Sequence, residues 1–220
     1  MGDGEAAGDE ASNAAPEPSN AAPEPASSAR RAPRRNDPAG LRRKVLDIAD
    51  AIFQERGYHA ASLADVVAAA GVTGGALHHH FASKKALGLA VVWERVAPEV
   101  ERTWAETMAA APNARAGVRQ VFLDVAEALE RQGFVKGCPL NNLALELSLA
   151  DPEFRAAVAG IFQAWRVLIA RRFKDDQRVG REDARADAQV FAARAIATYS
   201  GAMAMAKAAQ DPSYLRICAP

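Results

Sequence analysis

Three closely spaced helix starts between residues 62 and 87 limit what this chain can fold into more than any other feature of its sequence. Ser62 is followed three residues later by Asp65, and such a pair opens a helix as a capping box. Gly71 follows an apolar stretch and predicts the helix end, because glycine tolerates the left-handed conformation that closes a helix. A short helix is therefore expected over residues 63–70.

Two further starts follow at once. Thr73 is placed to cap a second short helix over residues 74–81, and Ser83 to cap a third that begins at Lys84. Two short helices joined by a glycine-containing turn of a few residues are the outline of a helix-turn-helix. In that motif the second helix enters the DNA major groove with its N-terminal residues against the base edges.

The expected recognition helix has almost no bulk in its first turn, where Gly74 and Gly75 follow Thr73. Small residues there let backbone N–H groups approach phosphates or base edges, and a helix N-terminus favours an anion. Hydroxyl and ammonium groups nearby can donate to phosphate oxygens. The residues expected to contact DNA are Arg42, Arg43, Lys44, Ser62, Thr73, Gly74, Gly75, Leu77, His78, His79 and Lys84.

Three blocks of the chain match one known pattern: residues 49–53 with Gly57-Tyr58, Ser62 with residues 66–72, and the run 75–87, which contains His-His-His-Phe-Ala-Ser-Lys-Lys-Ala-Leu. With these blocks, residues 41–88 resemble the DNA-binding domain of the tetracycline-repressor (TetR) family of bacterial transcriptional regulators. The chain departs from the family at His78, where Tyr is usual, and at Gly74, where a longer polar residue is usual. The resemblance implies phosphate contacts from Ser62, Thr73, His79 and Lys84.

The apolar residues of this region have an ordinary structural interpretation. Phe53, Val66, Leu77 and Phe81 are expected to form a small core, and Tyr58 to pack beneath the motif. Leu77 is thus expected both in this core and among the DNA contacts.

Residues 1–38 are predicted to be a disordered tail rich in Ala, Pro and Glu. They repeat Ser-Asn-Ala-Ala-Pro-Glu-Pro and cannot bury enough apolar surface to offset their ordering entropy. Seven basic residues then occur in fifteen positions: Arg30, Arg31, Arg34, Arg35, Arg42, Arg43 and Lys44. This arm either adds electrostatic affinity for DNA or is a solvated linker.

The rest of the chain shows helical periodicity and no alternating strand pattern. We therefore expect an all-α protein with an N-terminal three-helix DNA-binding domain over 39–87. A helical ligand-binding and dimerisation domain is expected over 88–210, and a C-terminal tail over 211–220. A long helix is expected over 84–110, bent or interrupted at Pro98, and a last one over 181–209.

Small residues line one side of the last long helix: Ala184, Ala188, Ala192, Ala195, Ala202 and Ala206, with Tyr199 between them. Such a side allows close helix–helix approach, either with a second subunit in a four-helix bundle or within the monomer. A lone recognition helix reads few base pairs, which favours a dimer. The resemblance implies homodimerisation through the two C-terminal helices.

Two groups of residues are candidates for binding an unknown small-molecule effector. The aromatic candidates are Trp104, Phe122, Phe162, Trp165 and Tyr199, and the polar candidates are Asn142 and Glu146; each could equally be ordinary core or surface. Cys138 lies just before a helix and near Lys136, a setting that lowers a thiol pKa and favours reactivity. The alternative is an inert buried thiol.

Other classes of site lack support in the sequence. There is no nucleophile–base pairing, paired carboxylate set or phosphate-cradling loop, so we expect no enzyme. The consecutive His78, His79 and His80 cannot converge on one ion, so no metal or other cofactor is expected. Two cysteines, the lack of a signal peptide and the lack of a run of about 18 apolar residues predict a cytoplasmic protein.

The predicted function is a homodimeric transcriptional regulator, in the form of a repressor that a ligand releases from a pseudo-palindromic operator of double-stranded DNA. The alternatives are an activator, a redox or electrophile sensor acting through Cys138, and, from a different class, an all-helical small-molecule-binding protein that does not use DNA.

Overall fold

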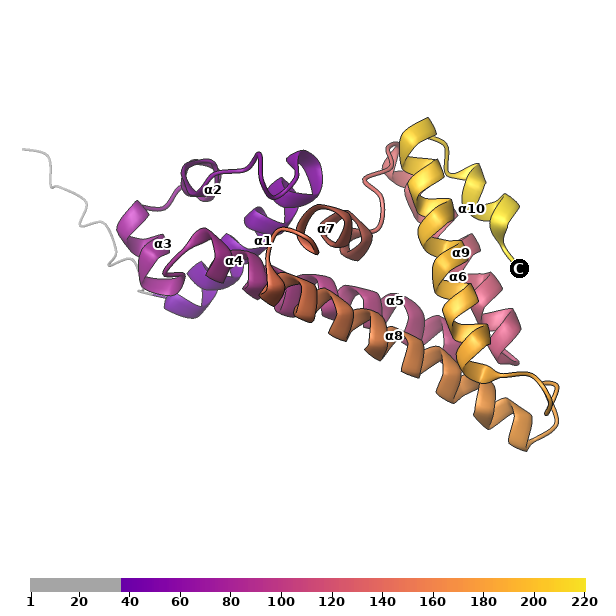
Figure 1. Ribbon diagram of the computed structural model, residues 1–220. Helices are drawn as coiled ribbons and strands as arrows, with labels where there is room; N and C mark the ends of the chain where they lie inside the picture. The colour runs from indigo at the N-terminus through magenta and orange to yellow at the C-terminus, as the bar shows by residue number, and fades with distance from the viewer. Residues whose placement is uncertain (1–36) are drawn as a thin grey trace, which may run out of the picture. The chain divides into compact units, whose positions relative to one another are not determined.

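The computed structural model describes residues 37–220, and these residues are helical with no strand, as predicted (Figure 1). We call the first four helices the head: α1 (Pro38–Arg56), α2 (Leu63–Ala70), α3 (Gly74–His80) and α4 (Lys84–Val91). A π-helical turn, η1 (Val92–Val96), follows. We call the remaining helices the body: α5 (Ala97–Ala110), α6 (Ala114–Gln132), α7 (Pro139–Leu147), α8 (Pro152–Arg178), α9 (Ala188–Ala209) and α10 (Ser213–Cys218). Residues 1–36 of the predicted tail and four of the seven basic residues of the arm lie outside the described residues. The tail was predicted to reach residue 38, but Asp37 caps α1 and Pro38 is its first residue.

The head has the small core that the sequence predicts. Phe53, Val66, Leu77 and Phe81 are all buried, and α1 packs against α2, α3 and α4. Tyr58 extends this core into the body, because its ring meets Phe53 with centroids 5.2 Å apart and Phe154 of α8 with centroids 5.1 Å apart.

The helix predicted over 84–110 is interrupted near Pro98. The π-helical turn η1, which ends two residues before Pro98, separates α4 from α5. Proline has no N–H, so the carbonyl of Glu94 loses its usual helical partner. Nη1 of Arg95 donates to that carbonyl over 2.8 Å, and Nε of Arg95 pairs with Asp47 of α1 over 2.6 Å. The irregular turn is thereby bound to the head.

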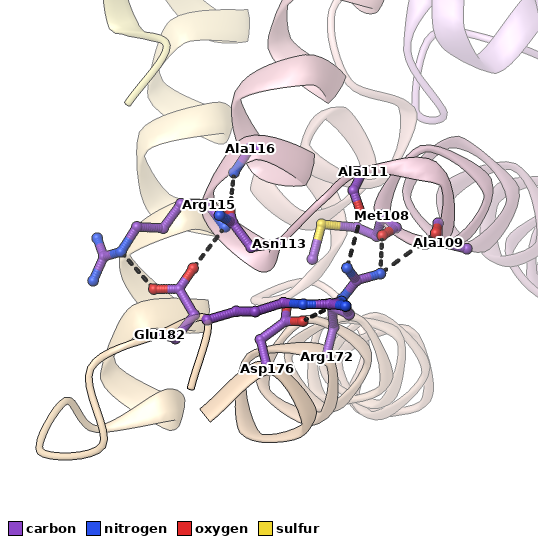
Figure 2. Close-up of polar contacts among 10 residues, drawn as sticks. Met108, Ala109, Ala111, Asn113, Arg115, Ala116, Arg172, Asp176 and Glu182 are labelled. Atoms are coloured by element: carbon purple, nitrogen blue, oxygen red, sulfur yellow. Dashed lines mark hydrogen bonds and ion pairs between the residues drawn. The ribbon is translucent and has the colours of Figure 1, made fainter. Parts of the chain in front are cut away.

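In the body, α5 lies beside α8, α9 packs against α8, and α10 packs against both α6 and α9 (Figure 1). Arg172 of α8 closes the C-terminal end of α5. Its guanidinium donates to the carbonyl oxygens of Met108 over 2.5 Å and Ala111 over 2.8 Å, and pairs with buried Asp176 over 2.8 Å (Figure 2). One side chain thus satisfies carbonyls that the end of a helix leaves without intrahelical partners.

The last long helix begins later than predicted. Residues 181–187 form turns, and α9 starts at Ala188 with the Asp187 carboxylate accepting from the N–H of Gln189 over 2.7 Å. The preceding turns are held by long-range contacts. Glu182 accepts from Nε of Arg115 over 2.8 Å (Figure 2), and Gln177 donates to the carbonyl of Ala186 over 2.8 Å.

Residues 211–220 do not form the tail that we predicted. They contain α10, whose Leu215 is completely buried and whose Arg216 pairs with Glu130 of α6 over 2.6 Å. The six-residue helix has little periodicity of its own, and its packing against α6 and α9 stabilises it. Within residues 37–220, no helix combines the length and apolarity that a membrane crossing requires.

The small-residue side of α9 packs inside the chain. Ala188, Ala192, Ala195, Ala202 and Ala206 are buried against the rest of the body, whereas Ala184 is exposed in the turn that precedes the helix. This side is therefore unavailable to a second subunit. Of the two alternatives, packing against a second subunit and packing within the monomer, the structure shows the second. The opposite side of α9 is exposed and consists mostly of small and apolar residues, with Arg194 among them: Val190, Ala193, Ala197, Gly201, Ala204, Met205 and Ala208.

Candidate nucleic-acid interface and ligand groove

The three capping interactions predicted in the head are all present. The Ser62 hydroxyl accepts from the N–H of Asp65 over 3.1 Å, and the Asp65 carboxylate accepts from the N–H of Ser62 over 2.8 Å. Hydrogen bonds from the hydroxyl and N–H of Ser62 lower the pKa of the Asp65 carboxyl. Thr73 and Ser83 accept from N–H groups in the first turns of α3 and α4 over 3.1 and 3.0 Å. These caps fix where each helix of the motif starts.

The first turn of α3 faces solvent. Thr73, Gly74, Gly75, His78 and His79 are exposed, and a Cβ added at either glycine would meet no atom within 4 Å. The fold itself therefore does not require glycine at these two positions. The missing side chains leave the backbone N–H groups of this turn accessible to an incoming phosphate or base edge.

Leu77 is 2% exposed and lies in the core of the head. The expectation that it contacts DNA is therefore wrong, and its expected place in the core is the one it takes. Around the helix axis Leu77 lies nearly opposite Gly75 and His79, and its apolar side chain packs inward.

The basic residues of α1 are not equivalent. Arg42 forms a bidentate pair with Glu94, and its guanidinium carbon lies 5.1 Å from the ring centroid of Phe81. The hydrogen bond from Arg42 lowers the pKa of Glu94. The structure thus pairs Arg42 with η1, and the DNA contact expected for it stays a prediction. Arg43 and Lys44 are exposed.

Two further expected phosphate donors are partly engaged within the head. The Ser62 hydroxyl donates to the Asp65 carboxylate over 2.6 Å, so its proton is not free for a phosphate. The Lys84 ammonium donates to the carbonyl of His59 over 3.3 Å and lies 4.5 Å from the ring centroid of Tyr58. An ammonium carries three protons, so Lys84 still has protons to donate outward.

The aromatic residues expected in a ligand pocket pack on one another. The centroid of the Trp104 ring lies 5.0 Å from that of Trp165 and 5.3 Å from that of Tyr199, whose ring lies 5.4 Å from Phe122. Phe162 stacks on Trp165 with centroids 6.0 Å apart. Trp104, Phe122, Trp165 and Tyr199 are buried, so they are core, which was the alternative interpretation of each; Phe162 is half-buried and packs against them.

A groove of about 690 Å³ lies instead between α5 and α8. Its apolar lining includes Trp93, Val100, Met108, Ile161, Trp165 and Leu168. Of the residues predicted for ligand binding, only Trp165 borders it. The two helices that create the groove are separated in the chain by residues 111–151, so the sequence contains no local signal for it. The indole of Trp93, which borders the groove, is 52% exposed.

Asn142 and Glu146, the polar candidates for ligand binding, contact the head and do not line the groove. Nδ2 of Asn142 donates to the side-chain oxygen of Gln54 in α1 over 3.0 Å. The Glu146 carboxylate accepts from the backbone N–H groups of Tyr58 over 2.8 Å and His59 over 2.5 Å.

Cys138 is 4% exposed, and burial raises the pKa of its thiol from 9.0 to about 11. The N–H groups of Asn141 and Leu140 at the start of α7 act in the predicted direction and lower the pKa, but desolvation of the thiolate outweighs them. The prediction of a reactive thiolate is therefore wrong, and the inert buried thiol is the alternative that holds.

Comparisons with known proteins agree with this geometry. Residues 45–91 match the family described as bacterial regulatory proteins, tetR family, and residues 114–220 match the C-terminal domain described as transcriptional regulator LmrA/YxaF-like. The chain is 30% identical to the HTH-type transcriptional repressor DhaR of Mycobacterium sp. over 74% of this chain and 80% of the relative. It is 28% identical to the transcriptional regulator AcuR of Cereibacter sphaeroides over 73% of this chain and 74% of the relative.

Among solved structures, the regulatory protein TetR from Rhodobacter sphaeroides is similar with a TM-score of 0.73 and 26% identity. The alignment covers 81% of this chain and 94% of that protein.

Proposed function

Because this chain belongs to the tetR family of bacterial regulatory proteins and is thus a transcriptional regulator with a DNA-binding domain, we propose that it is a homodimeric repressor released from its operator by a small-molecule effector. The observation that carries the DNA-binding part is the open first turn of α3. Gly74 and Gly75 are exposed, no atom of residues 37–220 fills the space where their side chains would be, and Thr73 caps the turn.

In this proposal Thr73, Gly74, Gly75, His78 and His79 face the major groove. Arg43, Lys44 and Lys84 supply contacts to the phosphates around it. The predicted contacts from Leu77, Arg42 and the Ser62 proton are left out of the interface, for the reasons given above.

A repressor of this kind needs two recognition helices about 34–36 Å apart, so that they reach successive major grooves of a pseudo-palindrome. We propose that the second copy docks on the exposed side of α9, which presents Ala193, Ala197, Gly201 and Ala204. Small side chains on this side permit close approach of a partner helix.

We place the effector in the groove between α5 and α8, whose mostly apolar lining, which also contains Glu101, Arg171, Arg172 and Asp175, fits a largely apolar molecule. Binding there would favour one packing of α5 against α8 and shift the population toward heads spaced wrongly for DNA. That the related DhaR is named a repressor supports repression over activation.

Alanine substitution of the two glycines tests the DNA-binding surface. Gly74→Ala and Gly75→Ala should leave the fold intact or stabilise it by up to about 1 kcal/mol, because alanine is the better helix former. Both should weaken binding to a duplex that the wild-type protein selects from a random library, by roughly tenfold or more, because a methyl group would hold the backbone away from the DNA.

The control is Ala128→Ser, a small change at an exposed position of α6 that lies outside the head, the groove and the exposed side of α9. Its DNA affinity should equal that of the wild-type protein. Unchanged affinity in both head variants, measured by fluorescence anisotropy, would remove the first turn of α3 from the interface.

A further inference from the structure

α7 has two sides with different roles. Leu140, Leu143 and Leu147 are buried in the body. Asn142 and Glu146, one helical turn apart, reach out of the body to α1 and to the turn that follows it. Lys207 of α9 donates to Asn142 over 3.1 Å, so this polar side of α7 connects the body to the head through side-chain hydrogen bonds.

The strongest of these connections is made by Glu146. Its two carboxylate oxygens accept from two successive backbone N–H groups, those of Tyr58 over 2.8 Å and His59 over 2.5 Å. Gly57 has a φ of 86°, and a Cβ placed there would lie 3.2 Å from Glu146. The glycine therefore provides both the backbone conformation and the space that the carboxylate needs.

The turn of Tyr58 and His59, which Glu146 binds, also contacts the side chain of Lys84. The ammonium of Lys84 donates to the carbonyl of His59 over 3.3 Å and lies 4.5 Å from the ring centroid of Tyr58. Tyr58 and His59 thus bind Glu146 of the body through their N–H groups, and they contact Lys84 through the Tyr58 ring and the His59 carbonyl.

We propose that Glu146 is a positioning residue for DNA binding. It fixes the Tyr58–His59 turn and, through that turn, the Lys84 ammonium that contacts a phosphate. The inference rests on the proposed function, and it gives Glu146 a role in the head in place of the ligand contact that the sequence suggested.

The proposal predicts a change in DNA affinity opposite to the one that charge alone predicts for removal of the Glu146 carboxylate. Removing a carboxylate from a DNA-binding protein reduces repulsion from the phosphates and should strengthen binding if the charge were all that mattered. If Glu146 positions Lys84, Glu146→Ala should weaken binding roughly tenfold, the cost of losing one charge-assisted contact. Glu146→Gln, which keeps one acceptor oxygen, should fall between the wild-type protein and Glu146→Ala.

The test uses the full chain and a duplex that the wild-type protein selects from a random library, with affinity measured by fluorescence anisotropy across a salt series. Glu55→Gln is the control, because Glu55 is an exposed carboxylate of α1. It should bind DNA as tightly as the wild-type protein or more tightly. Circular dichroism at the assay temperature establishes that each variant is folded.

A double-mutant cycle with Lys84→Ala separates positioning from general weakening. If Glu146 acts through Lys84, the double variant binds no more weakly than Lys84→Ala alone. In both single variants the dependence of DNA affinity on salt concentration should also decrease by about the amount that one phosphate contact contributes. Glu146→Ala binding as tightly as the wild-type protein, or additive losses in the double variant, would overturn the proposal. A wild-type protein that selects no duplex would instead overturn the proposed function itself.

Discussion

The thiol of Cys138 stands at the N-terminus of α7, where two effects on its pKa oppose each other. The N–H groups of the first helical turn stabilise a thiolate, whereas burial removes the water that would solvate it. At 4% exposure desolvation is the larger effect, and the pKa rises to about 11. The same residue at the same helix end would be reactive if its surroundings were open.

We expect Cys138 to resist alkylation in the folded protein. At pH 8 iodoacetamide should modify half-exposed Cys218 and leave Cys138 intact, and peptide mass spectrometry identifies the modified residue. In denaturant both should react. Rapid modification of Cys138 in the native protein would show that the thiol is accessible and would restore the sensor alternative.

The raised pKa has a consequence for stability at high pH. A thiol whose pKa is higher in the folded than in the unfolded chain contributes stability that is complete below 9.0 and is lost as the pH rises toward about 11. Tyr199, whose pKa burial also raises, acts in the same direction. Replacing Cys138 by Ser, which does not titrate in this range, should reduce the loss of stability between these two pH values.

At the scale of elements, the contact between α5 and α8 depends on a few polar groups at the helix end. Arg172 donates to the carbonyls of Met108 and Ala111, and over a longer 3.5 Å to that of Ala109, and it pairs with the carboxylate of Asp176, which is 3% exposed (Figure 2). Without Arg172, the nearest remaining cation to Asp176 is Arg181, 3.8 Å away and mostly exposed. The end of α5 and the buried carboxylate therefore share one partner.

Arg172→Met should destabilise the fold by about 3 kcal/mol, because it leaves a buried charge and two helix-end carbonyls unpaired. The control on the same helix is Arg178→Met, whose pair with Asp175 is exposed and should contribute no more than about 0.5 kcal/mol. Urea unfolding at equal protein concentration measures both. Equal destabilisation by the two substitutions would show that Arg172 is no more important than a surface ion pair.

At the scale of the whole molecule, the two sides of α9 have different surroundings. One side supplies alanines to the core of the chain, and the other presents small and apolar residues to solvent. Both sides are poor in charge, so a helix wheel alone does not distinguish them. We propose that the exposed side meets its counterpart in a second copy, which would set the distance between the two heads.

Ala197→Glu should convert the dimer to monomers, because pairing α9 with itself would bury a carboxylate without a partner. Size-exclusion chromatography with light scattering measures the mass, and operator binding should fall with it. Ala128→Glu, the same change at an exposed position of α6, is the control and should remain dimeric. A dimeric Ala197→Glu protein would move the interface elsewhere.

Much of the head could be predicted because its signals are local. Ser62 with Asp65, Gly71, Thr73 and Ser83 each act within one helical turn, so the caps and ends they predict appear in the structure. The predictions from sequence were wrong or incomplete where the partner of a side chain lies far away in the chain. Arg42 pairs with Glu94, and the turn before α9 is held by Arg115, contacts that no local pattern indicates.

The sequence by itself determined the all-helical fold, the helix-turn-helix and the small core of the head, since helix periodicity and capping depend on residues a few positions apart. Only the tertiary structure decided whether Cys138 is reactive, which side of α9 is free, and that Asn142 and Glu146 face the head. Burial and pairing are properties of neighbours in space, and those neighbours come from helices that are distant in the chain.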